Sequence, residues 1–245
     1  MNPQSPFSYR CNQCGRCCHN QVITLSPVDV IAMARSTGLD TGAVVARYTL
    51  RRGSLLRFDS SHGCVALEGV QCSIHGGRPL ACRLYPLGLE RDGANERFIR
   101  LEPAVGSTGI YGDDGTIAEF LSVQGTAQML DLNARYQVLI ALLRDRVSRL
   151  VDFEIVEPRE FWRRAVAEAL RETNFDPNAL IAAIFDPDGA GCHRASLEET
   201  VTAHLAALNA MGRAASDAPT LAAAAILLAV SLGYAPSAAI AVTND

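Results

Sequence analysis

The chain has 245 residues, of which 49% are hydrophobic and 20% are charged, a balance that supports a folded core and excludes an intrinsically disordered protein. Its net charge of −4 and pI near 5.7 give no reason to expect nucleic acid as a partner. All 22 basic residues are arginines, so the chain can use neither a catalytic lysine nor a phosphate-binding lysine.

The amino end, MNPQSPFSYR, lacks the basic start and apolar run of a secretory signal. We therefore expect a cytoplasmic protein in a reducing compartment. In such a compartment cysteines are metal ligands or reactive thiols before they are disulfides.

Two short helices are predicted near the amino end. Ser26, Pro27 and Asp29 are typical of a helix start, with a cap, a proline in the first turn and an early acidic residue. That helix is expected to end at Gly38. A second short helix, capped by Asp40, follows it.

Hairpins are predicted in the next segment. The two apolar runs of CVALEGVQCSI indicate a hairpin that turns at 68–69, and LGLERDGANERFIRLE indicates another that turns at 92–93. Between them, RPLACRLYP is expected to form a short turn or helix bounded by its prolines. VGSTGIYGDDG is interpreted as a glycine-rich loop, which could bind an anion through its backbone N–H groups.

The second half of the chain is predicted to be helical. From about residue 124 apolar residues recur at helical spacing, and helices are expected to begin at Pro158 and at Asp176-Pro177. Ser196 and Glu199 form a capping box for another helix. The uncharged stretch 218–244 is rich in alanine, so we interpret it as a buried or oligomer-forming helix rather than a membrane span.

These patterns predict an α+β protein with two parts. Residues 1–122 are expected to form an irregular, cysteine-rich metal-binding domain with short helices and hairpins, because seven of the eight cysteines precede residue 83. Residues 123–245 are expected to form an all-helical region that packs on that domain. The oligomeric state is left open.

The segment CNQCGRCCHN holds four cysteines in eight positions. Cys11, Cys14 and Cys17 follow C-x2-C-x2-C spacing, which suits tetrahedral zinc and iron–sulfur clusters alike. Cys18 follows directly, and because neighbouring side chains project in different directions, Cys17 and Cys18 do not easily share one mononuclear site. Either they serve two metal ions, or they reach different corners of a cluster, or one is not a ligand; the crowding favours more than one ion.

Further ligands must come from later in the chain. Cys64 and Cys72 lie on the hairpin predicted around residue 68, Cys82 lies in RPLACR, and His75 lies between these cysteines. Cys192 stands apart from them. It is as well explained by a small buried hydrophobe as by a ligand, and its pairing with the adjacent His193 as a nucleophile and base is a weak signal.

Two arginines stand next to the later cysteines. Arg78 and Arg83 are flanked by prolines that restrict the backbone. We expect their guanidinium groups to donate to sulfur, which lowers the thiol pKa values and orients the ligands. The alternative is that they are ordinary surface arginines.

Three segments in order carry a resemblance: CNQCGRCC, ITLSPVDVIAMARSTGL and CSIHGGRPLACRLYP. Together they resemble the zinc- or iron-chelating cysteine-cluster family (CxxCxxCC, YkgJ-like) over about residues 9–125. Members of that family are described as iron–sulfur or zinc proteins of unsettled activity. The resemblance implies a metal-binding set of Cys11, Cys14, Cys17, Cys18, Cys72 and Cys82, with Cys64 as a further member.

One position departs from the family pattern. Relatives often carry Cys-Pro-Gly-x-Gly after the Arg-Pro region, whereas this chain has EPAVGSTG, so that Glu102 stands where a cysteine is expected. Either Glu102 is a ligand, although a carboxylate is a harder one, or Cys192 takes the vacant place, or one metal position is lost.

We interpret the chain as an iron–sulfur or iron protein with a redox or electron-transfer role, because its thiolate-only set suits clusters as well as zinc. Its partners would be metal ions and a redox protein, with neither nucleic acid nor membrane. The alternative is an interaction module stabilised by zinc. The resemblance extends more remotely to flagellin lysine N-methylases, but the chain has no C-x3-C-x2-C spacing and no dinucleotide-binding glycine motif.

Overall fold

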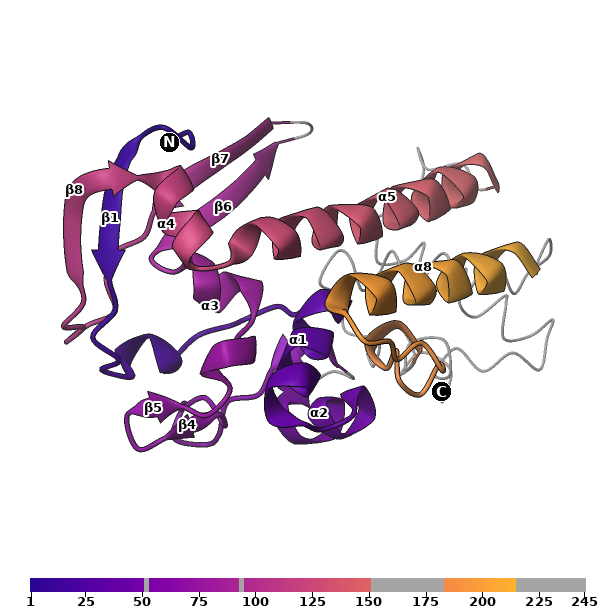
Figure 1. The fold of residues 1–245 in the computed structure, drawn as a ribbon, viewed down its shortest axis with the longest axis horizontal. Helices are drawn as coiled ribbons and strands as arrows, with labels where there is room; N and C mark the ends of the chain where they lie inside the picture. Colours follow the sequence, from indigo (N-terminus) through magenta and orange to yellow (C-terminus); the bar gives the residue numbers. More distant parts are fainter. Residues whose placement is uncertain (51–52, 93–94, 151–182, 215–245) are drawn as a thin grey trace.

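A computed structural model describes residues 1–50, 53–92, 95–150 and 183–214 (Figure 1). Short helices and small antiparallel strand pairs make up the first 125 residues, and long helices make up the later described residues, which confirms the α+β class. The helices expected from Pro158 and from Asp176-Pro177, and the one near 219–233, lie outside the described residues. The domain boundary at residue 122 stays a prediction.

The two predicted amino-terminal helices are confirmed with their caps. Ser26 and Asp29 bond reciprocally at the start of α1 (Pro27–Thr37), where the Ser26 hydroxyl accepts the N–H of Asp29 and the Asp29 carboxylate accepts the N–H of Ser26. Gly38 ends this helix in the left-handed region. Asp40 caps α2 (Thr41–Tyr48) through the N–H of Ala43.

Both predicted hairpins form, and the segment between them is the helix α3 (Leu80–Leu84). Each strand pair stands alone as a two-stranded antiparallel sheet. The pairs within this part of the chain are β2 (Thr49–Leu50) with β3 (Leu55–Leu56), β4 (Leu67–Glu68) with β5 (Gln71–Cys72), and β6 (Leu87–Asp92) with β7 (Asn95–Arg100).

The expectation of a loop over VGSTGIYGDDG is wrong for its second half. Residues Ile110–Thr116 form strand β8, which pairs with β1 (Pro6–Arg10) from the amino end (Figure 1). The pair carries a register shift between Pro6 and Ser8. The strand tolerates the glycines that suggested a loop because it pairs with one strand only and all its residues are exposed or half-buried.

Three helices follow β8 along the described chain. Thr116 and Glu119 form a capping box for α4 (Ile117–Val123), which the sequence analysis did not identify. The predicted long helix is α5 (Thr126–Leu150), and the predicted capping box of Ser196 and Glu199 begins α8 (Leu197–Ala214). None of the described helices has the length and apolar content to cross a bilayer, and 218–244 lies outside the region described.

The main core is shared between the two halves of the sequence. Val28 of α1 and Val44 of α2 are fully buried against Leu132 of α5 and Val201 of α8. A smaller core lies under the β1–β8 pair, where the rings of Phe7 and Phe120 meet edge to face with centroids 5.1 Å apart. Helices α5 and α8 run side by side above α1 (Figure 1).

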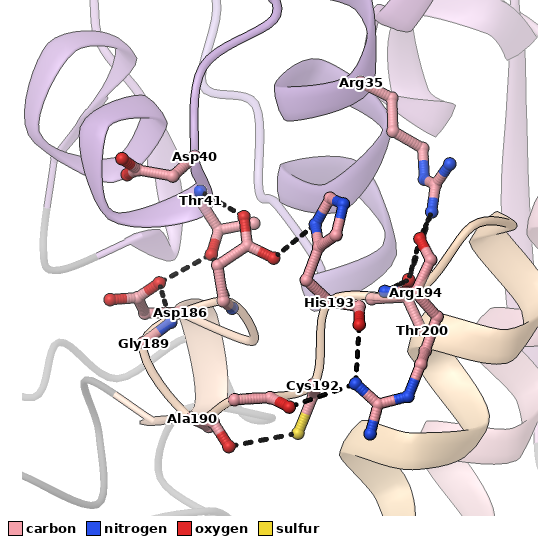
Figure 2. A network of polar contacts seen from close by, with 12 residues as sticks. Arg35, Asp40, Thr41, Asp186, Gly189, Ala190, Cys192, His193, Arg194 and Thr200 are labelled. Carbon is pink, nitrogen blue, oxygen red and sulfur yellow. Dashed lines mark hydrogen bonds and ion pairs between the residues drawn. The ribbon is translucent and has the colours of Figure 1, made fainter.

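A polar network fastens residues 186–200 to α1 and α2 (Figure 2). Thr41 donates its N–H to Asp188 Oδ2, at 2.9 Å, and its hydroxyl to Asp186 Oδ1, at 2.5 Å. Arg35 donates to the carbonyls of residues 194 and 195 and to the hydroxyl of Thr200. The network holds the start of α8 against the end of α1.

Candidate metal centre

All eight cysteines of the chain are free thiols. Seven of them line one continuous cavity of about 830 Å³, although they lie on segments that are far apart in the sequence. These seven are Cys11, Cys14, Cys17, Cys18, Cys64, Cys72 and Cys82. The sequence analysis chose the same seven as metal ligands, and the structure brings them to a common space.

A tight turn brings the amino-terminal cysteines to the cavity. Cys17 and Cys18 lie on the 3₁₀ turn η1 (Arg16–Cys18), which follows Gly15 in the left-handed conformation with φ of 70°. A Cβ at Gly15 would stand 3.3 Å from the carbonyl oxygen of Val70, so a glycine is favoured on both counts. The turn therefore depends on the glycine between Cys14 and Cys17.

The backbone joins Cys18 directly to Cys64. The N–H of Cys64 donates to the carbonyl of Cys18 at 2.8 Å, and the N–H of Asn20 donates to the carbonyl of His62 at 2.9 Å. These two bonds lay the CxxCxxCC segment alongside residues 62–64. They explain how a thiol more than 40 positions away reaches the same cavity.

The remaining two thiols follow from how the next segment packs on α1. Cys72 ends the hairpin strand β5, and the chain then passes through the turn η3 (His75–Gly77) to α3, which carries Cys82. A Cβ on Gly77 would lie within 2.3 Å of the carbonyl oxygen of Ala32, so only glycine allows this approach to α1.

The two arginines predicted to contact sulfur are placed differently from that expectation. Arg83 donates to the carbonyls of Gly76, Arg78 and Gln124, at 2.5, 3.0 and 2.9 Å. Arg78 donates to the carbonyl of His75 and to the Gln124 side chain. Within the described chain, no hydrogen bond from either guanidinium reaches a sulfur atom. Both arginines instead tie the 75–83 segment to the end of α4.

Five of the thiols interact with one another electrostatically, with Cys64 buried and the other four half-buried. A hydrogen bond between Cys17 and Cys18 lowers the pKa of Cys17 and raises the pKa of Cys18. Burial raises the pKa values of the other three thiols, Cys64, Cys72 and Cys82. Buried thiols with raised pKa values stay protonated unless a bound cation displaces the protons, which is the condition under which metals bind cysteine.

Cys11 and Cys14 lie on the segment between β1 and η1, and we call them the outer two thiols and the other five the inner five. Cys11 is exposed, and the pKa of Cys14 is lowered chiefly by a hydrogen bond from the backbone N–H of Thr108. Asn12 donates its side-chain N–H to the carbonyl of Thr108 at 2.6 Å. The pairing of β1 with β8 brings residues 107–109 close to Cys14.

Only one of the three additional ligand candidates lies on the cavity. His75 lines it beside Cys72 and Cys82. Glu102 is exposed and lies outside its lining, and Cys192 is buried against residues 186–194, where its thiol donates to the carbonyl of Ala190 (Figure 2). The structure thus places neither Glu102 nor Cys192 where the missing family cysteine would be needed.

The donor set fits a metal by its chemistry. Among the potential metal ligands that line the cavity are seven thiols and one imidazole, which zinc and iron–sulfur clusters take, while both oxygens of the Asp29 carboxylate already accept hydrogen bonds from Ser26 and Leu80. No three of the His, Cys, Asp and Glu side chains in the described part are arranged so as to hold one ion. Which of the seven cysteines are ligands therefore stays a prediction.

Comparison with known protein families agrees with the sequence motifs. Residues 10–103 match the family model CxxCxxCC, described as a putative zinc- or iron-chelating domain. The resemblance drawn from the three motifs is confirmed for that segment, and with it the metal-binding character of the cysteine cluster. No curated protein and no solved structure matches the chain.

Proposed function

We propose that this chain is an iron protein, holding an iron–sulfur cluster or iron ions among its amino-terminal cysteines and serving in electron transfer with a redox partner in the cytoplasm. The observation that carries the proposal is the meeting of seven thiols from separate segments on one cavity. Four are enough for a tetrahedral zinc ion, so seven exceed the needs of a single zinc site.

The inner five thiols are the ligands we assign first. They line the same cavity, are buried or half-buried, interact electrostatically, and would each give up a proton to a bound cation. Cys11 and Cys14 would complete the set from the outer end, which supports more than one metal position. An iron–sulfur cluster held there supplies one-electron redox chemistry, with a potential that depends on burial and on hydrogen bonds to sulfur.

The protein around the thiols would orient them and limit the entry of water. Leu25, Leu56 and Ile74 line the cavity and are each less than 8% exposed. Cys11 is the exposed thiol among the seven, so an electron would have its shortest route out on that side. We therefore place the docking site of the redox partner around residues 11–14.

A zinc-stabilised interaction module is the alternative function. The observation that favours it is the small size of the elements around the cysteines, since the β2–β3 and β4–β5 pairs have two residues in each strand. Closed thiolate sites stabilise irregular regions of this kind outright. In that case the metal is structural and no electron is transferred.

Purification of the full chain without oxygen, followed by absorption spectroscopy and elemental analysis, separates the two functions. We expect a brown protein with charge-transfer absorption, iron in stoichiometric amount and, for a cluster, acid-labile sulfide. A colourless protein with stoichiometric zinc would favour the interaction module. A protein that binds neither metal would end both proposals.

A further inference from the structure

The lining of the cavity extends beyond the cysteines to a group of mainly apolar side chains, and we call this part of the cavity the apolar arm. Its volume of about 830 Å³ lies within the range of small-molecule sites, which is roughly 300–1,000 Å³. Metal held by the thiols would occupy the cysteine end only. The walls of the apolar arm come from the approach to α1, from α5, from residues 184–185 and from α8, and they include Leu25, Asn133, Tyr136, Ile184, Phe185 and Leu208.

The apolar arm selects against charge. Ile184, Phe185 and Leu208 are each 4% exposed or less, so hydrocarbon and the rings of Phe185 and Tyr136 make up most of its surface. Of the arm residues just named, only Asn133 and Tyr136 are polar, and none is charged. Burying an ion against such walls without a partner is strongly unfavourable. A ligand of the arm is therefore neutral and mainly apolar.

In the apolar arm Asn133 supplies a buried hydrogen-bond acceptor to which no described residue donates, whereas Gln137, which also lines the cavity, is exposed. Its side chain is 8% exposed and lines the cavity. Its amide N–H donates to the carbonyl of Met129 at 2.9 Å, while its Oδ1 has no hydrogen-bond donor among the described residues. The neighbouring Tyr136 hydroxyl donates its proton to His204 Nδ1, at 2.7 Å, and keeps only its oxygen as an acceptor. A buried carbonyl oxygen is rarely left without a donor.

We propose that the apolar arm is a binding site for a neutral, mainly apolar small organic molecule that donates an N–H or O–H to Asn133 Oδ1. The molecule lies next to the cysteine thiols but is held by hydrocarbon walls and this single hydrogen bond. The proposal concerns a site other than the metal ligands and does not depend on which metal they hold.

A matched pair of probes tests the hydrogen bond. Indole and 1-methylindole are both neutral and apolar, and only indole has an N–H donor. We expect isothermal titration of the purified full chain to give one saturable site, with indole binding about five- to tenfold more tightly than 1-methylindole, as one net hydrogen bond allows. In Asn133→Leu, which keeps the volume and removes the acceptor, the two probes are expected to bind equally.

A pair of tryptophan variants tests the location. Leu208→Trp fills the apolar arm and is expected to reduce the affinity for both probes at least about tenfold, because little of the binding space remains. Val138→Trp is the control, since Val138 lies on the same helix α5 as Asn133 but is 61% exposed. Thermal unfolding shows whether each variant is folded.

The outcomes are separable from those of the metal proposal. Absence of saturable binding, or equal binding by the Leu208→Trp and Val138→Trp proteins, would overturn the site. Equal affinity of the wild type for the two probes would overturn the role of Asn133. If Leu208→Trp fails to fold, the Asn133→Leu comparison still decides. Metal content is measured on the same samples, so a chain without metal that binds indole overturns the proposed function alone.

Discussion

The carboxylate of Asp29 joins the start of helix α1 to the start of helix α3. Its Oδ1 accepts the N–H of Leu80 at 2.7 Å, and its Oδ2 accepts the N–H and the hydroxyl of Ser26 at 2.7 and 2.8 Å. Asp29 is 3% exposed. Because Cys82 follows Leu80 by two residues, this carboxylate sets how α3 presents Cys82 to the cavity.

The first prediction concerns Asp29→Asn. An amide has one accepting oxygen, so either Leu80 or Ser26 loses its buried acceptor. The free energy of unfolding is expected to fall by about 1–3 kcal/mol, measured by urea denaturation. The metal content is expected to fall with it, since Cys82 is no longer held in place.

Asp40→Asn is the matched control for that change. Asp40 caps α2 by a single bond to the N–H of Ala43 and is exposed, and asparagine caps helices as well as aspartate does. Stability and metal content should stay near those of the wild type. An Asp29→Asn protein that behaves like this control would show that the link to Leu80 does not position Cys82.

The second prediction concerns the adjacent cysteines. If Cys17 and Cys18 serve different metal positions or different corners of a cluster, Cys17→Ser and Cys18→Ser should each lower the metal affinity. Loss of a residue that only supports a ligand costs about 10–100-fold in affinity, and loss of a ligand itself should cost more. Elemental analysis after dialysis against a chelator measures the loss. Cys192→Ser, which is away from the cavity, should keep its metal. If only one of the two adjacent variants loses metal, the other cysteine is not a ligand.

The third prediction concerns Arg83, whose guanidinium reaches three backbone carbonyls at once. Lysine keeps the charge but cannot span the three acceptors. Arg83→Lys should therefore lower the free energy of unfolding by about 1–3 kcal/mol, as measured by urea denaturation, and weaken metal retention by loosening the 75–83 segment.

Arg135→Lys provides the comparison for Arg83. Arg135 bonds to Asp131 and Glu198 on an exposed surface, where ion pairs contribute little to stability. An equal loss of stability in the two lysine variants would show that the three hydrogen bonds from Arg83 to carbonyls stabilise the fold no more than an exposed ion pair does.

The sequence predicted the elements whose signals are local. The cap at Ser26, the helix end at Gly38, the capping box at Ser196 and the turn around 68–69 each depend on residues within a few positions of one another. The seven cysteines of the cavity were also found, because thiol spacing and the family motifs mark them directly.

What the sequence did not predict depends on contacts between distant segments. Strand β1 pairs with β8, which lies about 100 residues later in the chain, and the glycines of β8 resemble those of a loop. The acceptors of Arg83 are backbone carbonyls, which leave no trace in the sequence. The same is true of the bond from Leu80 to Asp29, because the sequence marked Asp29 only as an early acidic residue of the first helix.

The fourth prediction comes from a buried histidine in the helical part. His204 is fully buried; its Nε2 bonds to the carbonyl of Ala183 and its Nδ1 to the hydroxyl of Tyr136, both at 2.7 Å. The carbonyl can only accept, so Nε2 carries the proton and Nδ1 accepts from Tyr136. Burial lowers the pKa of His204 from 6.5 to about 4, and the folded protein keeps this ring neutral.

In the unfolded chain the same ring takes up a proton near its ordinary pKa of 6.5, and the folded chain does not until about 4. The free energy of unfolding should therefore fall as the pH drops between these values, by at most about 1.4 kcal/mol per pH unit. His204→Gln cannot titrate and should lose this part of the slope, while Tyr136→Phe keeps the imidazole and should retain it. Urea denaturation at a series of pH values measures all three proteins. Equal slopes in the wild type and His204→Gln would mean that another group governs the acid sensitivity.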